Sequence, residues 1–365
     1  MNKKFLTVAI FGALYTTSSV AATLYSNEGT TLSVGGHMSV ALDSHGGNSA
    51  NGTNANTDTE NEVGISSPSP RINITGIHEL GNGYTVDARG EWATNMLNGG
   101  ENAFTTRLGY LGISHEDHGR LVIGTQWAPY YNVAGVADMP ISFANDFIYN
   151  NHGNLGTGRG NDMVSYRNSF DFNDTMSVDL GVAWQGKNIS TNSTTSSVSA
   201  VYDDRAQVAL TLNVANFALG YAYNGGDFTF TPGASTKDKA KSNLVSAKYG
   251  TYGEGLYAAA VYAKNENMNN YKKGDLVNSE ALAKESTATE FVVAYAFSNS
   301  LNLSANYERV EDDKLNDTIR KESAIQAEYK FTPKFVGFSG YQFDLNDKKG
   351  RKKDDMWKLG VRYYL

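Results

Sequence analysis

The chain has 365 residues, 40% of them hydrophobic, with 37 Gly, 22 Tyr, 16 Phe, no Cys and a formal net charge of −7. This apolar and aromatic content is too high for a disordered chain, and a mean hydropathy of −0.41 argues against a helical membrane bundle. The lack of Cys excludes thiol nucleophiles, Cys-ligated metals and disulfides. The acidic balance argues against a nucleic-acid partner, which requires a basic face, so we expect no nucleic acid.

Residues 1–21 have the features of a secretory signal peptide. Lys3 and Lys4 precede an apolar segment of roughly 11 residues, and small residues at 19–21 suit a signal peptidase. The apolar run is too short for a transmembrane helix, which needs about 20 residues. We therefore expect an exported domain over 22–365, and the loss of Lys3 and Lys4 changes the net charge from −7 to −9.

The remainder of the chain repeats one pattern, in which apolar and polar residues alternate. Residues 31–42 are the first example, and 84–92 are the next clear one, with Asp87, Arg89 and Glu91 on the same face. A period of two is typical of a strand whose two faces meet different environments. Charged side chains in such a row cannot face a dry core.

Counting such segments predicts about 16 strands, at 31–42, 71–80, 84–93, 104–114, 119–126, 161–168, 175–186, 205–213, 217–224, 242–249, 255–264, 288–297, 301–310, 322–331, 335–345 and 355–365. Long connections follow the odd-numbered strands and short ones the even-numbered strands. A transmembrane barrel has this arrangement, with short periplasmic turns and long external loops, and its aromatic residues gather near strand ends. We therefore predict an all-β fold, a 16-stranded antiparallel transmembrane β-barrel in the outer membrane.

A barrel of this size is wide enough to hold a water channel. Arg71 shares a face with Asn73 and Thr75, and Arg107 alternates with Leu108, so both arginines are expected to point into the lumen. An Arg at the lipid midplane would cost about 2–4 kcal/mol. The longest internal connection, 127–160, is too rich in aromatic residues for an exposed loop, and we expect this third loop to fold inward.

Five short segments, in order along the chain, carry a resemblance to a known family. They are Ala22-Thr23-Leu24-Tyr25, Arg71-Ile72-Asn73-Ile74-Thr75-Gly76, Thr106-Arg107-Leu108-Gly109-Tyr110-Leu111-Gly112, Asp138-Met139-Pro140-Ile141-Ser142-Phe143-Ala144-Asn145-Asp146 and Met163-Val164-Ser165-Tyr166-Arg167-Asn168-Ser169. Over 22–365 the chain resembles the Gram-negative general diffusion porins. The resemblance implies a homotrimer of barrels, each narrowed by its third loop, through which small hydrophilic solutes and ions diffuse passively.

The resemblance also implies which residues form the pore constriction. They are three wall arginines, an inward carboxylate, two loop acids and two positions that depart from the family pattern: Arg71, Arg107, Arg159, Glu91, Asp138, Asp146, Ser142 and His37. Ser142 stands where the family commonly has Glu, and His37 where it commonly has Lys. Both charged walls are therefore thinner than in the family.

Two further expectations concern charge. A water-lined imidazole at His37 would titrate near its reference pKa of about 6.5. The net charge of −9 expected for the exported domain predicts a mild preference for cations, weakened by salt. The basic run 348–353 is expected to be a solvated loop, with contact to anionic lipopolysaccharide as the alternative. Membrane lipid and lipopolysaccharide are thus the expected surroundings.

Two alternative functions remain open at this point. One is an outer-membrane barrel enzyme, phospholipase- or protease-like, but none of the six His has a nucleophile motif beside it. The other is a substrate-specific sugar channel, which needs a track of aromatic side chains along the lumen. We expect a channel rather than an enzyme, with no cofactor and no metal site.

Overall fold

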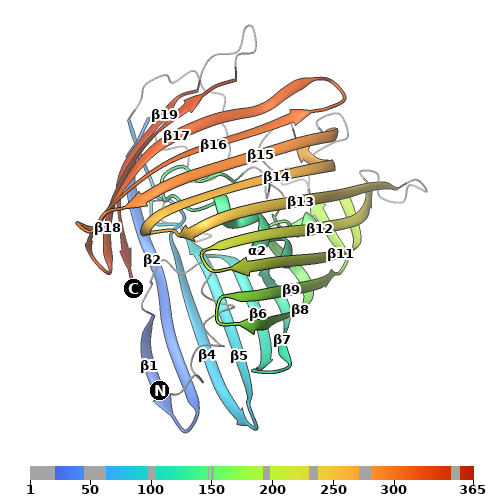
Figure 1. The fold of residues 1–365 in the computed structure, drawn as a ribbon, viewed down its shortest axis with the longest axis vertical. Helices are drawn as coiled ribbons and strands as arrows, with labels where there is room; N and C mark the ends of the chain where they lie inside the picture. Colours follow the sequence, from blue (N-terminus) through green and yellow to red (C-terminus); the bar gives the residue numbers. More distant parts are fainter. Residues whose placement is uncertain are drawn as a thin grey trace.

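The strands of the protein form one continuous curved wall, with a loop segment inside it (Figure 1). The computed structural model describes residues 21–44, 63–97, 104–146, 148, 152–191, 198–229, 237–270, 282–346 and 354–365. No helix in these ranges is long and apolar enough to cross a membrane. The signal peptide expected at 1–21 lies outside them except for its last residue, and the basic run 348–353 lies wholly outside them.

The described residues form 19 strands, all in one antiparallel sheet, and 16 of them close it into a barrel. The barrel strands are β2 (Thr30–Asp43), β4 (Arg71–Gly81), β5 (Tyr84–Thr94), β6 (Phe104–His115), β7 (Gly119–Trp127), β8 (Arg159–Asn173), β9 (Met176–Gln185), β11 (Val198–Val214), β12 (Phe217–Thr229), β13 (Asp238–Thr251), β14 (Glu254–Asn270), β15 (Leu282–Ala296), β16 (Leu301–Asp312), β17 (Asp317–Thr332), β18 (Phe335–Asp344) and β19 (Met356–Tyr364). The pairing of β19 with β2 closes the ring. The predicted fold class is confirmed.

Three short strands that the periodicity did not predict lie against this ring. They are β1 (Ala22–Asn27), β3 (Gly64–Ser66) and β10 (Asn188–Thr191). β1 pairs with the first residues of β2, whereas β19 pairs with the last ones. The two therefore follow one another along the same edge of β2, beside which the C-terminal end also lies (Figure 1). The backbone N–H of Leu365 donates to the Gly36 carbonyl at 3.1 Å.

The two faces of the wall have opposite character, as the alternation predicts. On β2, Val40 and Leu42 are 38% and 44% exposed on the outside, while Ser39 and Asp43 are buried on the inside. Apolar side chains on the outer surface are stable only where lipid covers them. Polar residues on the inner face keep water in the lumen.

Strands β11–β17 extend further at their outer ends than predicted. β14 reaches Asn270 rather than residue 264, and β15 begins at Leu282 rather than residue 288. Above the lipid both faces of a strand meet water or loops, so the apolar alternation stops although backbone pairing continues. The alternation in the sequence therefore predicts the lipid-covered part of each strand and not its full length.

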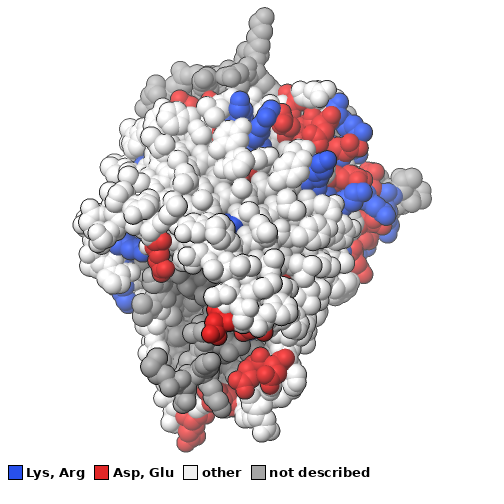
Figure 2. Space-filling view, viewed as in Figure 1, with Lys and Arg blue, Asp and Glu red and all other residues white. Residues whose placement is uncertain are grey.

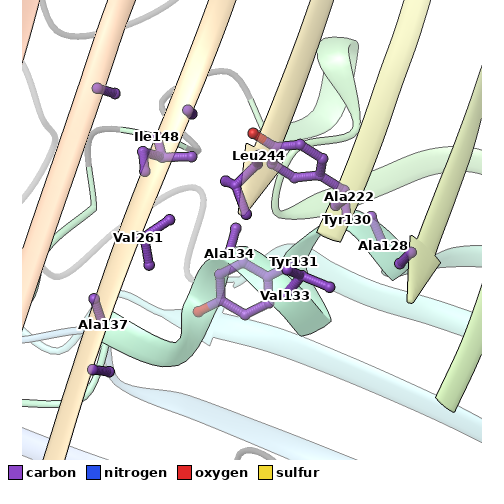
Figure 3. Packing of buried hydrophobic residues seen from close by; sticks show 14 of the residues in the cluster. Ala128, Tyr130, Tyr131, Val133, Ala134, Ala137, Ile148, Ala222, Leu244 and Val261 are labelled. Atoms are coloured by element: carbon purple, nitrogen blue, oxygen red, sulfur yellow. The ribbon is translucent and has the colours of Figure 1, made fainter. Parts of the chain in front are cut away.

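The third loop folds inward, as predicted, and packs on the inner wall. It contains α2 (Pro129–Ala134), the 3-10 turn η4 (Gly135–Ala137) and α3 (His152–Leu155). Tyr130, Val133 and Ala134 of α2 are almost fully buried against Leu244 and other small wall residues (Figure 3). Burial of such side chains contributes about 1.5–3 kcal/mol for each large one, which accounts for the apolar content of this loop.

Glycine is required at one position in each of two strands. Gly36 and Gly124 have φ values of +125° and +124°, and a Cβ at either would lie 2.2–2.3 Å from a carbonyl oxygen of the neighbouring strand. A side chain cannot be placed there without moving the backbone. These two positions therefore fix the local twist of β2 and β7.

Replacing Gly124 with Ala should destabilise the barrel by at least about 1–3 kcal/mol, the usual cost of a non-glycine residue in a strained conformation. The matched control is Gly109→Ala on the adjoining strand, where a Cβ would meet open space. Urea unfolding monitored by heat-dependent mobility on gels measures both variants. Equal midpoints for Gly124→Ala and Gly109→Ala would contradict this account.

Candidate functional site

Three arginines surround one carboxylate on the inner face of β4, β5 and β6. Glu91 Oε1 lies 3.0 Å from Arg107 Nε and 3.7 Å from Arg71 Nη1, and Glu91 Oε2 lies 2.8 Å from Arg89 Nη2. Arg71 is further held by Ser69, whose hydroxyl accepts at 2.6 Å. Because these groups stand on paired strands, their positions are fixed by the sheet itself.

A bulge places Arg107, so simple alternation does not describe this part of β6. Glu91 is opposite Leu108 and Trp92 is opposite Thr106, which leaves Arg107 as the extra residue. Leu108 therefore shares the inner face with Glu91 and is only 3% exposed, contrary to the expectation that it alternates with Arg107. The bulge still directs the Arg107 side chain toward Glu91.

Stacked aromatic rings connect the wall to the loop. The Arg159 guanidinium lies 5.9 Å from the centre of the Trp127 ring, and Trp127 stacks on Tyr131 with ring centres 4.2 Å apart. The Tyr131 hydroxyl donates a short hydrogen bond to Asp138 Oδ2. The predicted residues Arg159 and Asp138 are thus linked through two aromatic side chains that the sequence interpretation did not assign to the site.

Burial dominates the electrostatics of Asp138. Desolvation raises the pKa of its carboxyl group from 3.8 to about 7, and the nearby charge of Asp146 adds to this increase. The hydrogen bond from Tyr131 and the charges of Arg71 and Arg107 act in the opposite direction. Asp138 therefore gains its proton near neutral pH, several units above the range of an exposed carboxyl group.

Side chains of the opposite wall hold the tip of the loop. The backbone N–H of Phe143 donates to Gln326 Oε1 at 2.8 Å, and Gln326 Nε2 donates to the Phe143 carbonyl at 2.7 Å. The N–H of Ile141 donates to Glu328 Oε1 at 2.8 Å. These contacts imitate strand pairing and satisfy loop backbone groups that water cannot reach.

The loop acid Asp146 belongs to a second charge cluster. Arg320 of β17 lies 2.9 Å from Glu308, 2.8 Å from Glu322 and 3.7 Å from Asp146. Here one guanidinium lies among three carboxylates, whereas three guanidiniums surround the single carboxylate of Glu91. The two sides of the lumen therefore carry clusters of opposite charge, an excess of arginines around Glu91 and an excess of carboxylates around Arg320.

Buried amides hold the base of the loop. Gln185, Gln207 and Asn224 donate to the carbonyls of Gly153, Gly156 and Leu155 at 2.6, 2.7 and 2.6 Å. Gly156 has a φ of +58°, and a Cβ there would lie 2.3 Å from the Gln185 side chain. With both its base and its tip fixed, the loop crosses the lumen as a rigid element.

The two positions that depart from the family pattern are not open to water. His37 is only 7% exposed and lies against Tyr364, with ring centres 5.7 Å apart, so the expected water-lined imidazole is wrong. Ser142 is 8% exposed beside the backbone of Gly340. Both side chains are covered because the loop and the strand ends pack on them.

Several residues of this site were missed by the sequence interpretation. Arg89 shares the face of Glu91 two positions away, and Arg362 lies on the polar face of the last strand, so alternation held a signal for both. Gln326 and Glu328 also lie on the polar face of their strand, but alternation could not indicate that the third loop would reach them from nearly 190 residues away. Arg320 precedes the predicted strand 322–331 and gave no such signal.

The site holds charge and restricts width, and it contains no arrangement typical of catalysis. Among the described residues, no group of three or more His, Asp or Glu is placed to hold a metal ion. His115 and His118 stack on each other at the short turn between β6 and β7, which follows the end of β6 remote from Arg107. Fixed guanidinium and carboxylate groups beside a rigid loop are the means by which channels discriminate between ions.

Comparisons with known proteins agree with this geometry. The family model described as Gram-negative porin matches residues 6–365. The chain is 26% identical to outer membrane protein S2 of Salmonella typhi over the whole of both chains, and 24% identical to outer membrane porin F of Salmonella typhimurium over 100% of this chain and 99% of that one. The structure of Salmonella typhi OmpF in complex with daunomycin superposes with a TM-score of 0.74 at 21% identity, covering 94% of this chain and 100% of that one. The chain belongs to the Gram-negative porin family and is a passive diffusion channel of the outer membrane.

Proposed function

We propose that solutes crossing this channel are selected at the constriction between the inward loop and the arginines of β4–β8. The observation that carries the proposal is the attachment of the loop at both ends, by Gln185 and Gln207 at the base and by Gln326 at the tip. A loop fixed in this way keeps a constant gap to Arg71 and Arg107. Width and charge at that gap then decide which solutes pass.

Two observations weigh against the alternative functions. A sugar channel needs accessible aromatic rings along the lumen, but Tyr130 and Tyr131 of the loop are 0% and 2% exposed. A barrel enzyme needs a nucleophile beside a base, and the constriction instead contains arginines paired with Glu91. Small hydrophilic solutes and ions remain the proposed substrates.

We also propose that the channel is a homotrimer in contact through the outer face of β4–β6. On this face Gly76 is opposite Ala88, Ala88 is opposite Leu111, and Gly109 is fully open. Tyr84 and Phe104 are exposed near strand ends of this face, but exposed aromatic residues are more numerous on the other strands: Phe217, Tyr221, Tyr262, Phe291, Tyr295, Tyr329, Phe331, Tyr341 and Phe343. Aromatic girdles are typical of lipid-facing surfaces, and small residues such as Gly76, Ala88 and Gly109 allow a second barrel to approach closely.

Lipopolysaccharide is the proposed partner at the outer ends of β11–β16. Charges of both signs gather there above a broad uncharged surface (Figure 2). They include Lys237 with Asp203 at 2.8 Å, Lys241 with Glu266 at 2.7 Å, and Lys314 with Glu285 at 2.8 Å. Lysines suit anionic phosphate groups, and carboxylates suit the divalent cations that accompany them.

Replacing Gln326 with Leu should raise the mean conductance and the current noise of single channels in a planar bilayer. The change removes two hydrogen bonds to Phe143, each worth about 0.5–1.5 kcal/mol, and so releases the loop tip. The matched control is Gln342→Leu on β18, an equally buried amide that donates to Glu322 and not to the loop. Identical traces for both variants would mean that Gln326 does not hold the constriction.

A bulky residue on the proposed contact face should prevent trimer formation without harming the barrel. Gly109→Trp has open space around its Cβ within one barrel but would meet the neighbouring barrel in a trimer. Crosslinking in mild detergent should recover trimers from the unsubstituted protein and monomers from this variant. The control is Ala305→Trp, outward on β16, and loss of trimers in that variant instead would place the contact elsewhere.

Ion preference should change with pH in a step near 7, because burial raises the pKa of Asp138 to about 7. Below that pH the carboxyl group is neutral and the constriction is more positive, so the ratio of anion to cation permeability should be higher. One charge at about 6 Å in water favours one ion and disfavours the other about threefold each, so it changes this ratio by about tenfold.

Reversal potentials measured between pH 5 and 9 test this step. Asp138→Asn should abolish it, whereas His37→Gln should keep it because His37 is packed away from water. Tyr131→Phe removes the hydrogen bond that favours the ionised form and should move the step to higher pH. A step that survives in Asp138→Asn would assign the titration to another group.

A further inference from the structure

The groups that a passing solute meets at the arginine wall are guanidiniums and not the carboxylate between them. The side chains of Arg71, Arg89 and Arg107 are 23%, 30% and 14% exposed, whereas that of Glu91 is 4% exposed. Glu91 therefore lies behind the arginines and holds them together. Its single negative charge offsets only one of three positive charges.

Two more arginines extend this wall without any acidic partner. Arg362 donates to Ser39 Oγ at 2.8 Å and to the Pro68 carbonyl at 3.3 Å, both neutral acceptors. Arg159 lies over the Trp127 ring, and among the described residues no carboxylate lies within 4.0 Å of it. Both side chains are half-buried, and each interacts with a carboxylate only from beyond ion-pair distance, Arg159 with Glu91 and Arg362 with Glu328.

The carboxylates of the opposite side are mostly occupied in holding the loop. Glu328, 9% exposed, accepts the N–H of Ile141 and the hydroxyl of Tyr252. Glu308, with a side chain 4% exposed, pairs with Arg320, which also pairs with Glu322 and Asp146. Of these four acids only Asp146, with a side chain 41% exposed, is open to the channel, and Arg320 lies 3.7 Å from it.

We infer that the constriction favours anions, and that this channel passes small oxyanionic solutes, carrying a carboxylate or a phosphate, faster than cations of the same size. The inference rests on the proposed role of the constriction and names the substrate class for it. Guanidinium is planar and always charged, and it binds oxyanions through two parallel hydrogen bonds.

This preference for anions is opposite to the preference for cations that the net charge of the chain predicts. Charges on distant loops act through water and are screened beyond about 10 Å at 0.1 M salt. A solute in the gap is closer than that to the arginines, so the local groups determine the preference. The net charge of −9 expected for the exported domain then affects only the approach to the channel.

Reversal potentials in a planar bilayer under a KCl gradient test the inference on the full barrel. The unsubstituted channel should show the sign of chloride preference. Arg71→Gln and Arg107→Gln should each lower the ratio of chloride to potassium permeability by about tenfold, because one charge at about 6 Å in water acts on the two ions about threefold each and in opposite directions. The control is Arg309→Gln, whose side chain pairs with Glu311 on the outer face, and it should leave the ratio unchanged.

Swelling of liposomes that contain the channel, in glucose or in gluconate of similar size, separates the possible failures. Faster entry of gluconate that is lost in Arg107→Gln supports the inference. Entry of glucose together with a potassium-selective reversal potential would overturn the anion preference and leave the channel intact. Absence of both conductance and glucose entry from folded protein would instead refute the proposed function. If an arginine variant does not fold, the reversal potential of the unsubstituted channel still shows whether chloride or potassium is preferred.

Discussion

The bilayer interior offers no partner to a backbone N–H or C=O, and the rest of this structure depends on that constraint. A sheet in lipid must have no free edge, so the last strand, β19, has to pair with the first long strand, β2. Closing 16 strands leaves a lumen too wide for side chains to fill, so water fills it. Because of this closure the wall is apolar on its outer face and polar on its inner face, where the arginines lie.

The same requirement acts on the inward loop, which has no strand beside it inside the lumen. Wall side chains take the place of a neighbouring strand: Gln326 binds both the N–H and the C=O of Phe143, and Gln207 accepts the N–H of Tyr130. Polar groups that satisfy the loop also make it rigid. Arginines on strands therefore face carboxylates on a loop that keeps its place almost as firmly as a strand would.

Much of the fold was predictable from the sequence, because lipid and water impose a period of two on every strand. The inner positions of Arg71 and Glu91 followed from that alternation. Alternation along a strand cannot indicate a bulge, so it placed Leu108 on the wrong face. It also cannot indicate which wall residues become covered, so His37 was expected to meet water. Glu328 and Arg320 were not predictable because their partners arrive from distant sequence. The family resemblance supplied the loop acids, which no local pattern would have identified.

The ring closure also sets an order of events during assembly. Arg362 and Ser39, which are hydrogen-bonded across the closing pair, stand 323 residues apart in the chain. Every other barrel strand pairs with its neighbour in sequence and has a partner soon after it is made, whereas the edge of β2 stays open until β19 arrives. Contacts of such separation form slowly, and an open edge pairs readily with other chains. The period before closure is therefore when this protein is most exposed to misassembly, and its duration is determined by the whole length of the chain.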